Sequence, residues 1–178
     1  MTVRDGQPTQ LLWNFMMSHQ APYLIRDRKI RFAIVGCGRI ADRHTGALSA
    51  HADRAELVAV CDSDPIALEQ TSGSLGVSGY PSLDALLATS EADVVALCTP
   101  SGLHPQQAVQ VAKSGRHVVT EKPMATRLVD GKRMVAACDD AGVHLFVVKQ
   151  NRLNPTLQLL KNALVRKRFG RIYMVKIG

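Results

Sequence analysis

The sequence predicts an α/β protein built on a doubly wound parallel sheet, because short apolar runs alternate with helical stretches from Lys29 onward. Several of these runs are apolar almost throughout, as is typical of strands that are covered on both faces. The predicted strands are residues 30–35, 56–61, 94–98, 117–120 and 144–148, with a weaker one around Gly79 and Tyr80. The predicted helices fill the gaps at about 40–49, 65–73, 83–89, 105–114 and 128–141.

Turn and cap residues support several of these boundaries. Asp64 followed by Pro65 is typical of a helix start with proline in the first turn. Gly115 and Gly142 follow the ends of two predicted helices, where glycine is the usual stop residue.

Beyond the last of these strands, the pattern indicates that a second structural unit begins. Asn154 and Pro155 are expected to cap and open a helix that runs to about Arg168, and residues 171–177 read as a strand. At the other end, residues 1–28 show no clear period and are expected to be an extension.

The composition is that of a compact soluble domain. Of 178 residues, 46% are hydrophobic, 21% charged and 4% aromatic, and no apolar run approaches the roughly 20 residues needed to cross a bilayer. The first residues lack the order of a signal peptide, so we expect a cytoplasmic protein without a membrane partner. The four cysteines form no C-x-x-C pair, which favours buried free thiols over a disulfide framework.

The net charge of +7 raises the possibility of nucleic-acid binding. Eight basic residues and no acidic one lie between residues 149 and 178, so the rest of the chain is close to neutral. This basic segment has few aromatic residues, Phe169 and Tyr173, and follows a regular helix and strand pattern. We therefore favour a solvated helix face over a nucleic-acid partner.

A G-x-G-x-x-A turn follows the first predicted strand and opens into a helix. Gly36 permits the tight turn, Gly38 lets the backbone approach a diphosphate, and Ala41 lets the helix pack closely on the strand. The free N–H groups at the helix start would receive the diphosphate. The turn predicts a dinucleotide site because it lies between a strand and a helix.

An acidic residue at the end of the second strand indicates which dinucleotide binds. Asp62 lies 24 residues after Gly38, close to where the acid that binds the adenosine ribose is expected. A carboxylate there accepts hydrogen bonds from the ribose hydroxyls and repels a 2'-phosphate, so NAD is favoured over NADP. The alternative, a cap of the next helix, fits Asp64 better.

Two later strands end in residues whose side chains could bind a ligand or take part in a reaction. One runs into Thr99, Pro100 and the helix that contains His104, and the next runs into Glu121 and Lys122. Ligands bind at the carboxyl ends of strands in an open parallel sheet, so both segments are candidates for the site.

Lys122 is the candidate for proton transfer. It is held against a proline and flanked by apolar residues of the strand, which would lower its pKa enough to donate or relay a proton. The alternative for Lys122 is a surface ion pair with Glu121 or Asp130, and the alternative for His104 is a plain place in the first turn of its helix. The other histidines show no ligand spacing, so no metal site is predicted.

Together these motifs resemble the Gfo/Idh/MocA oxidoreductases, which pair a Rossmann-type NAD-binding domain with an α/β substrate domain. The resemblance implies that the turn binds the diphosphate, Asp62 the adenosine ribose and Glu121 the nicotinamide ribose, and that Lys122 is the active-site lysine. The cofactor-site residues implied are Gly36, Gly38, Arg39, Ile40, Ala41, Asp62, Thr99, Pro100, His104 and Glu121.

The stretch that starts at Lys149 is similar to a narrower branch of that family. This branch oxidises the 3-hydroxyl of UDP-N-acetylglucosaminuronate on the way to lipopolysaccharide O-antigen sugars. A diphosphate and a carboxylate would then meet the charges of Lys149 and Arg152, unless these only solvate a loop. The substrate-binding residues implied are Lys149, Gln150, Asn151 and Arg152.

The resemblance also implies a domain plan. Residues 29–150 would form the NAD-binding domain and 151–178 the first helix and strand of a truncated substrate domain, within a family that forms homo-oligomers. The family's second domain carries an aspartate and a histidine near the reacting carbon, and the chain ends before such a pair. A non-catalytic NAD-binding module therefore stays open as an alternative to an enzyme.

Overall fold

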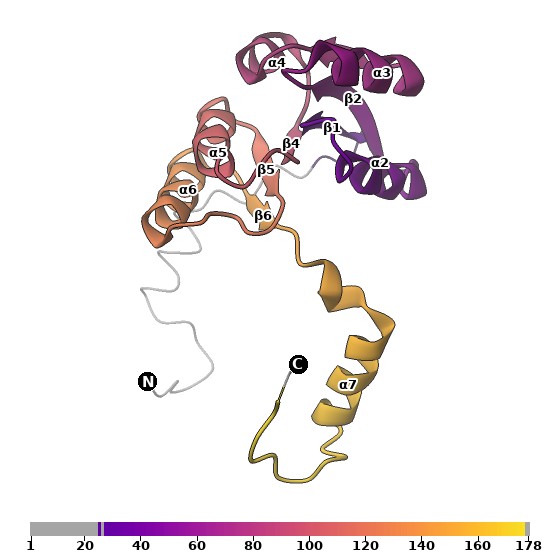
Figure 1. The fold of residues 1–178 in the computed structure, drawn as a ribbon, viewed down its shortest axis with the longest axis vertical. Helices are drawn as coiled ribbons and strands as arrows, with labels where there is room; N and C mark the ends of the chain where they lie inside the picture. The colour runs from indigo at the N-terminus through magenta and orange to yellow at the C-terminus, as the bar shows by residue number, and fades with distance from the viewer. Residues whose placement is uncertain (1–24, 26, 177–178) are drawn as a thin grey trace. The chain divides into compact units, whose positions relative to one another are not determined.

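A six-stranded parallel sheet forms the centre of the unit that ends at Val147 (Figure 1). The computed structural model describes residue 25 and residues 27–176. The strands follow the order β3-β2-β1-β4-β5-β6, and each neighbouring pair runs parallel. Their bounds are β1 Ile30–Val35, β2 Ala55–Cys61, β3 Ser78–Tyr80, β4 Val94–Leu97, β5 His117–Thr120 and β6 Leu145–Val147. The predicted doubly wound sheet is confirmed.

Helices cover the sheet from two sides. Side chains of α2 and α3 pack on one face around Ile34 and Val60, and side chains of α4, α5 and α6 pack on the other around Val95 and Val118. The helices are α2 Ala41–Ala50, α3 Pro65–Leu75, α4 Leu83–Thr89, α5 His104–Lys113 and α6 Leu128–Asp140. Strands between two helical layers are buried on both faces, which explains their continuous apolar runs.

The helix ends follow the local signals in the sequence. Asp64 caps α3, since its side chain accepts hydrogen bonds from the N–H groups of Ile66 and Ala67. Gly115 and Gly142 adopt positive φ angles of 76° and 65° just past α5 and α6, the conformation in which glycine ends a helix without steric cost.

The end of the described chain corrects one prediction. The helix α7 spans Pro155–Val165 and is capped by the side chain of Asn154, but residues 171–176 form no strand. A strand is stabilised by hydrogen bonds to a neighbour, and an alternating apolar pattern alone does not provide one. Residue 177 of that predicted strand lies outside the described residues.

The chain divides into two compact units, the first ending at Val147 and the second starting at Val148. The second unit contains the short 3-10 helix η1 (Gln150–Leu153) and α7, and neither has a buried residue. The expected extension at residues 1–28 falls outside the described residues, apart from residues 25, 27 and 28. None of the described helices combines the length and the apolar character that crossing a membrane requires.

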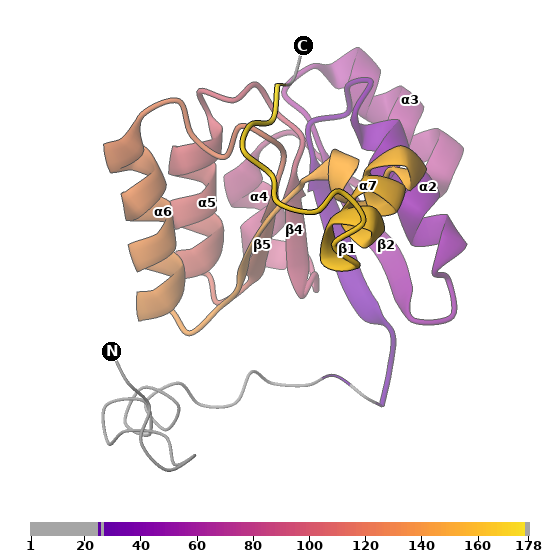
Figure 2. The ribbon, with the colours of Figure 1, turned by 90° about the horizontal axis from the view of Figure 1, so that it is seen from below.

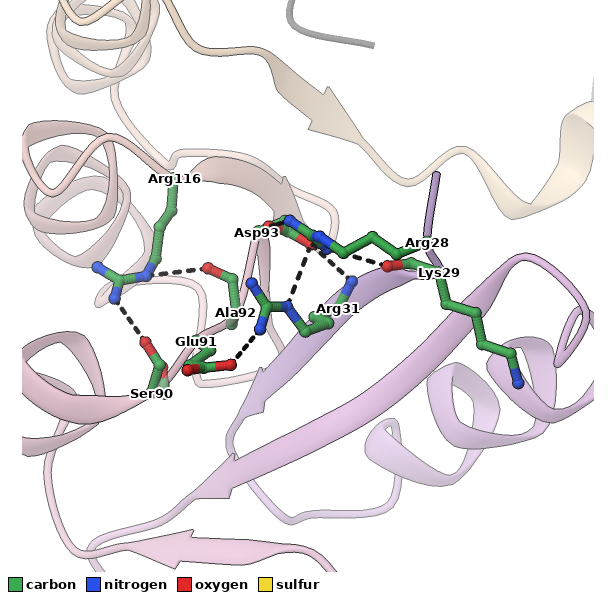
Figure 3. A network of polar contacts seen from close by, with 8 residues as sticks. All are labelled: Arg28, Lys29, Arg31, Ser90, Glu91, Ala92, Asp93 and Arg116. Carbon is green, nitrogen blue, oxygen red and sulfur yellow. Dashed lines mark hydrogen bonds and ion pairs between the residues drawn. The ribbon is translucent and has the colours of Figure 1, made fainter. Parts of the chain in front are cut away.

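Charged side chains join the strands at the amino edge of the sheet (Figure 3). Both guanidinium nitrogens of Arg28 donate to the Asp93 carboxylate, at 2.6 and 2.8 Å, and the backbone N–H of Arg31 donates to it at 2.8 Å. Arg116 donates to the carbonyls of Ser90 and Ala92. These contacts fix the starts of β1, β4 and β5 against one another and hold Arg28 beside Asp93.

Candidate cofactor site

The turn between β1 and α2 requires glycine at its first position. Gly36 has a φ of 95°, and its N–H donates to the carbonyl of Cys61 at 2.7 Å. A Cβ there would lie 2.9 Å from the backbone carbonyl carbon and oxygen of Cys98. Both the conformation and the close approach of β4 therefore exclude a side chain.

The following residues leave room for a ligand. A Cβ at Gly38 would meet no atom within 4 Å, and Gly38, Arg39 and Ile40 are exposed. The start of α2 carries no side-chain cap, and neither do the starts of α5 and α6. Uncapped N–H groups at a helix start bind anions, and phosphate is the common one. Ala41 is 2% exposed and packs in the core, as expected for close contact between helix and strand.

Asp62 is tied to this turn by its carboxylate. One oxygen accepts the N–H of Cys37 at 2.7 Å and the other accepts the N–H of Asp64 at 2.9 Å. Asp64, in turn, caps α3, as the sequence predicted, and the ribose-binding role of Asp62 stays a prediction. Each carboxylate oxygen has further lone pairs, which leaves Asp62 able to accept hydrogen bonds from a ligand.

A cavity of about 520 Å³ lies at this edge of the first unit. It brings together residues from the glycine turn, the end of β2 and the loop after β4. Its lining residues are Val35, Gly36, Gly38, Cys61, Asp62, Ser63, Pro81, Ser82, Leu83, Cys98, Thr99, Pro100, Leu103 and Gln107. The structure thus unites five of the predicted cofactor residues around one space.

A buried histidine contacts the backbone of the loop after β4. His104 is 1% exposed, and its two ring nitrogens lie 2.8 Å from the carbonyl oxygen of Thr99 and 3.0 Å from that of Pro123. The hydroxyl of Thr99 donates to the amide oxygen of Gln107 at 2.5 Å. His104 is the first residue of α5 and connects the Thr99 loop with the Lys122 loop.

Glu121 and Lys122 follow β5 at the same edge. The side chain of Lys122 is exposed, and its role in proton transfer stays a prediction. No ion pair of Lys122 with Glu121 or Asp130 is found among the described residues. Glu121 instead pairs with His44. Asp130 lies near Arg127 and Arg133, at the start of α6 and within it.

Sequence reasoning missed two residues of this edge. His44 reaches Glu121 from α2, and Gln107 reaches Thr99 from α5. Both partners are far along the chain or on another element, so no local pattern identifies the pairs. The signal for His44 was its place one helical turn after Ala41, on a helix that starts at the glycine turn.

Thiol chemistry is disfavoured at this edge. Burial raises the pKa of Cys61 to about 11 and that of Cys98 to about 12, so both stay protonated and unreactive near neutral pH. All four cysteines are free, and three are buried. Within the described residues, no three His, Cys, Asp or Glu side chains lie close enough to hold a metal ion.

The predicted substrate residues lie in the second unit. Lys149 precedes η1, and Gln150, Asn151 and Arg152 form it. All are exposed, which leaves their charged and amide groups accessible.

Comparison with known proteins agrees with this arrangement. Residues 30–149 match the family described as "Oxidoreductase family, NAD-binding Rossmann fold" (Gfo/Idh/MocA). Inositol 2-dehydrogenase from Rhizobium meliloti is 34% identical over 152 residues, which is 83% of this chain and 44% of that protein. The chain therefore spans less than half the length of this relative.

Two solved structures are more similar. The WlbA dehydrogenase from Bordetella pertussis, in complex with NADH and UDP-GlcNAcA, is 62% identical with a TM-score of 0.80, over 83% of this chain and 45% of that one. The WlbA dehydrogenase from Chromobacterium violaceum, also with NADH and UDP-GlcNAcA, is 63% identical with a TM-score of 0.81, over 84% and 44%.

Proposed function

Because the chain belongs to the Gfo/Idh/MocA oxidoreductase family, we propose that it is the cofactor-binding part of a dehydrogenase that oxidises a sugar-nucleotide hydroxyl with NAD. The observation that carries this proposal is the shared edge on which the glycine turn and Asp62 line one cavity and Glu121 and Lys122 follow a neighbouring strand. The substrate proposed is UDP-N-acetylglucosaminuronate, oxidised at its 3-hydroxyl. Similarity to two structures that contain NADH and UDP-GlcNAcA supports this choice.

The residues present fit NAD. Gly38 leaves the space above the backbone open, and the uncapped start of α2 offers N–H groups to a diphosphate. Arg39 and Ile40 belong to the same exposed turn. Asp62 would accept hydrogen bonds from the two adenosine ribose hydroxyls, and its negative charge would repel the 2'-phosphate of NADP.

The nicotinamide end would lie near the segments after β4 and β5. Thr99 and Pro100 line the cavity, while His104 supports both segments from beneath through carbonyl contacts. Glu121 would accept a hydrogen bond from the nicotinamide ribose. We propose that His104 acts through the loops that it connects, since its side chain is buried.

Lys122 would handle the proton of the reaction. Oxidation of a secondary alcohol breaks a C–H and an O–H bond, and bound NAD supplies the acceptor for the hydride. The proton of the hydroxyl must leave separately, and the exposed Nζ of Lys122 is a group that can hold or relay it. Lys149 and Arg152 would meet the anionic groups of the substrate, with Gln150 and Asn151 beside them.

Cofactor binding tests the first half of this proposal. Titration of the purified chain with NADH and with NADPH, followed by nicotinamide fluorescence, should show a clear preference for NADH. Asp62→Ala should weaken NADH binding and reduce the preference. Asp64→Ala is the matched control, because Asp64 is two residues away but caps α3; it should lower stability by about 1 kcal/mol and leave NADH affinity unchanged.

Turnover tests the second half. NADH formation from NAD and UDP-N-acetylglucosaminuronate should be measured for the chain and for Lys122→Ala, with Lys113→Ala as a surface control. Loss of turnover in Lys122→Ala alone would support an enzyme that uses this lysine. NADH binding with no turnover in any form would favour a non-catalytic NAD-binding module.

Two coarser proposals complete this assignment. The protein would act in the cytoplasm, and the full-length form of the family would assemble into homo-oligomers. Sedimentation velocity of that full-length form tests the second proposal, since a monomer at micromolar concentration would contradict it.

A further inference from the structure

His44 makes a contact that the proposed function does not explain. Its Nε2 lies 3.0 Å from Oε1 of Glu121, which is 77 residues away in the sequence. The His44 side chain is 17% exposed and that of Glu121 is 12% exposed. The contact is thus largely shielded from water, where hydrogen bonds to a charged group are strong.

The second oxygen of Glu121 is also engaged. The backbone N–H of Lys122 donates to Oε2 at 3.2 Å, and the backbone N–H of Glu121 donates to the carbonyl of Leu97 at 3.2 Å. The carboxylate is therefore held between α2 and the start of the Lys122 segment. Free lone pairs on both oxygens still allow it to accept a hydroxyl of a ligand.

The surroundings of His44 are mostly apolar, and its ring makes its polar contact with Glu121. The residue lines a cavity of about 260 Å³ whose other walls are mostly apolar, including Leu48, Ala96 and Val119. Among the described residues, Glu121 is the hydrogen-bond partner of the His44 ring. His51 lines the same cavity from the end of α2 and makes no such contact with Glu121.

We propose that His44 is a positioning residue that holds the Glu121 carboxylate in the orientation needed to accept a hydroxyl of the nicotinamide ribose. The inference rests on the proposed NAD-dependent function. α2 would then serve both ends of the cofactor, since the glycine turn at its start would meet the diphosphate and His44, in its first turn, would orient the acid at the nicotinamide end. Removal of His44 should affect the nicotinamide end and spare the adenine end.

Two ligands separate these ends in one experiment. NADH carries both halves of the dinucleotide, whereas ADP carries the half that would meet Asp62 and the glycine turn. Isothermal titration calorimetry with each ligand should compare the wild-type chain with His44→Ala, Glu121→Ala, the double variant and His44→Gln. His51→Ala is the matched control, because it removes a histidine that lines the same cavity just past the end of α2.

We expect His44→Ala and Glu121→Ala each to weaken NADH binding about tenfold, the effect of losing a hydrogen bond to a charged group, and to leave ADP binding unchanged. The double variant should bind NADH as the weaker single variant does, because both changes remove one interaction. His44→Gln should recover most of the affinity, since its amide N–H can replace the Nε2 donor.

Three results would overturn the inference. NADH affinity of His44→Ala equal to the wild type would remove the role, and additive effects in the double variant would show that the residues act independently. Equal loss of ADP and NADH binding in His44→Ala would indicate a structural role. A wild-type chain that binds ADP but not NADH, or neither, would instead contradict the proposed function and, with it, this inference.

Discussion

The two edges of the sheet differ in whether their polar groups are paired within the protein. At the amino edge, the carboxylate of Asp93 accepts hydrogen bonds from Arg28 and Arg31, and Arg116 binds two carbonyls, so the charged groups are answered within the fold (Figure 3). At the carboxyl edge, the start of α2 is uncapped and Lys122 is exposed. Figure 2 shows the strands side by side; each runs from the amino edge to the carboxyl edge. Polar groups that pair with one another hold the sheet together, and those left open are available to a ligand.

The glycine turn gives the largest expected effect. Gly36→Ala should lower the free energy of unfolding by at least about 3 kcal/mol, because a Cβ meets the backbone of Cys98, just after β4, and the φ is positive. Gly38→Ala should change it by less than about 0.5 kcal/mol and yet weaken NADH binding sharply. Urea denaturation and NADH titration of both variants provide the check. Equal stability loss at both positions would break the distinction between a folding glycine and a binding glycine.

The amino edge should respond in stability alone. Asp93→Ala should lower the free energy of unfolding by about 1 to 2 kcal/mol, because the Arg31 N–H and the Arg28 guanidinium lose their acceptor. Glu91→Ala is the control, since this acid also faces Arg31 but its side chain is 78% exposed, and exposed pairs contribute little. NADH affinity should stay at the wild-type value in both variants. A loss of NADH binding in Asp93→Ala would contradict the claim that the amino edge affects stability alone.

Acid titration sharpens the same contrast. Burial alone raises the pKa of Asp93, but the hydrogen bonds from Arg28 and Arg31 and their charges outweigh it and lower the pKa below its ordinary 3.8. The unfolded chain then binds the proton more readily than the folded one. The stabilisation is therefore present above pH 3.8 and lost as the pH falls through the lower folded value. Asp93→Asn should flatten this part of the stability curve, measured by urea denaturation against pH; an unchanged slope would contradict the assignment.

The smallest effect concerns a histidine pair at the amino edge. Burial and the nearby His144 lower the pKa of His117 below its ordinary 6.5, against the opposing charge of Asp93, and its Nδ1 accepts the backbone N–H of His144. Its contribution to stability is present above pH 6.5 and decreases as the pH falls through the folded pKa. His117→Gln should reduce this pH dependence and His51→Gln should not, as thermal melts between pH 5 and 8, chosen around the ordinary histidine pKa, would establish.

Much of the fold follows from local sequence. The strands at 30–35 and 117–120 and the helix at 83–89 are found at the predicted residues, because apolar runs, caps and glycine stops act over a few residues. The predicted strand at 171–177 is wrong for residues 171–176, since pairing depends on a neighbour that no local pattern specifies.

The sequence motifs of the candidate site could be recognised from spacing, but the contacts between its side chains could not. The glycine turn and Asp62 were found from spacing, which reflects the fixed geometry of a strand, turn and helix. The pairing of Glu121 with His44 was not, because the hydrogen bond closes over 77 residues. The exposure of Lys122 was not predictable for a related reason: solvent access depends on the elements around the sheet edge rather than on the neighbours of Lys122 in the sequence.

Backbone amide chemical shifts of the ¹⁵N-labelled chain, recorded while NADH is added, test the contrast between the edges most directly. The account predicts concentrated shifts at Gly38, Arg39, Asp62 and Lys122, with Arg31, Asp93 and Arg116 unchanged. Shifts of similar size at both edges, or shifts confined to the amino edge, would contradict the claim that the open polar groups at the carboxyl edge form the cofactor site.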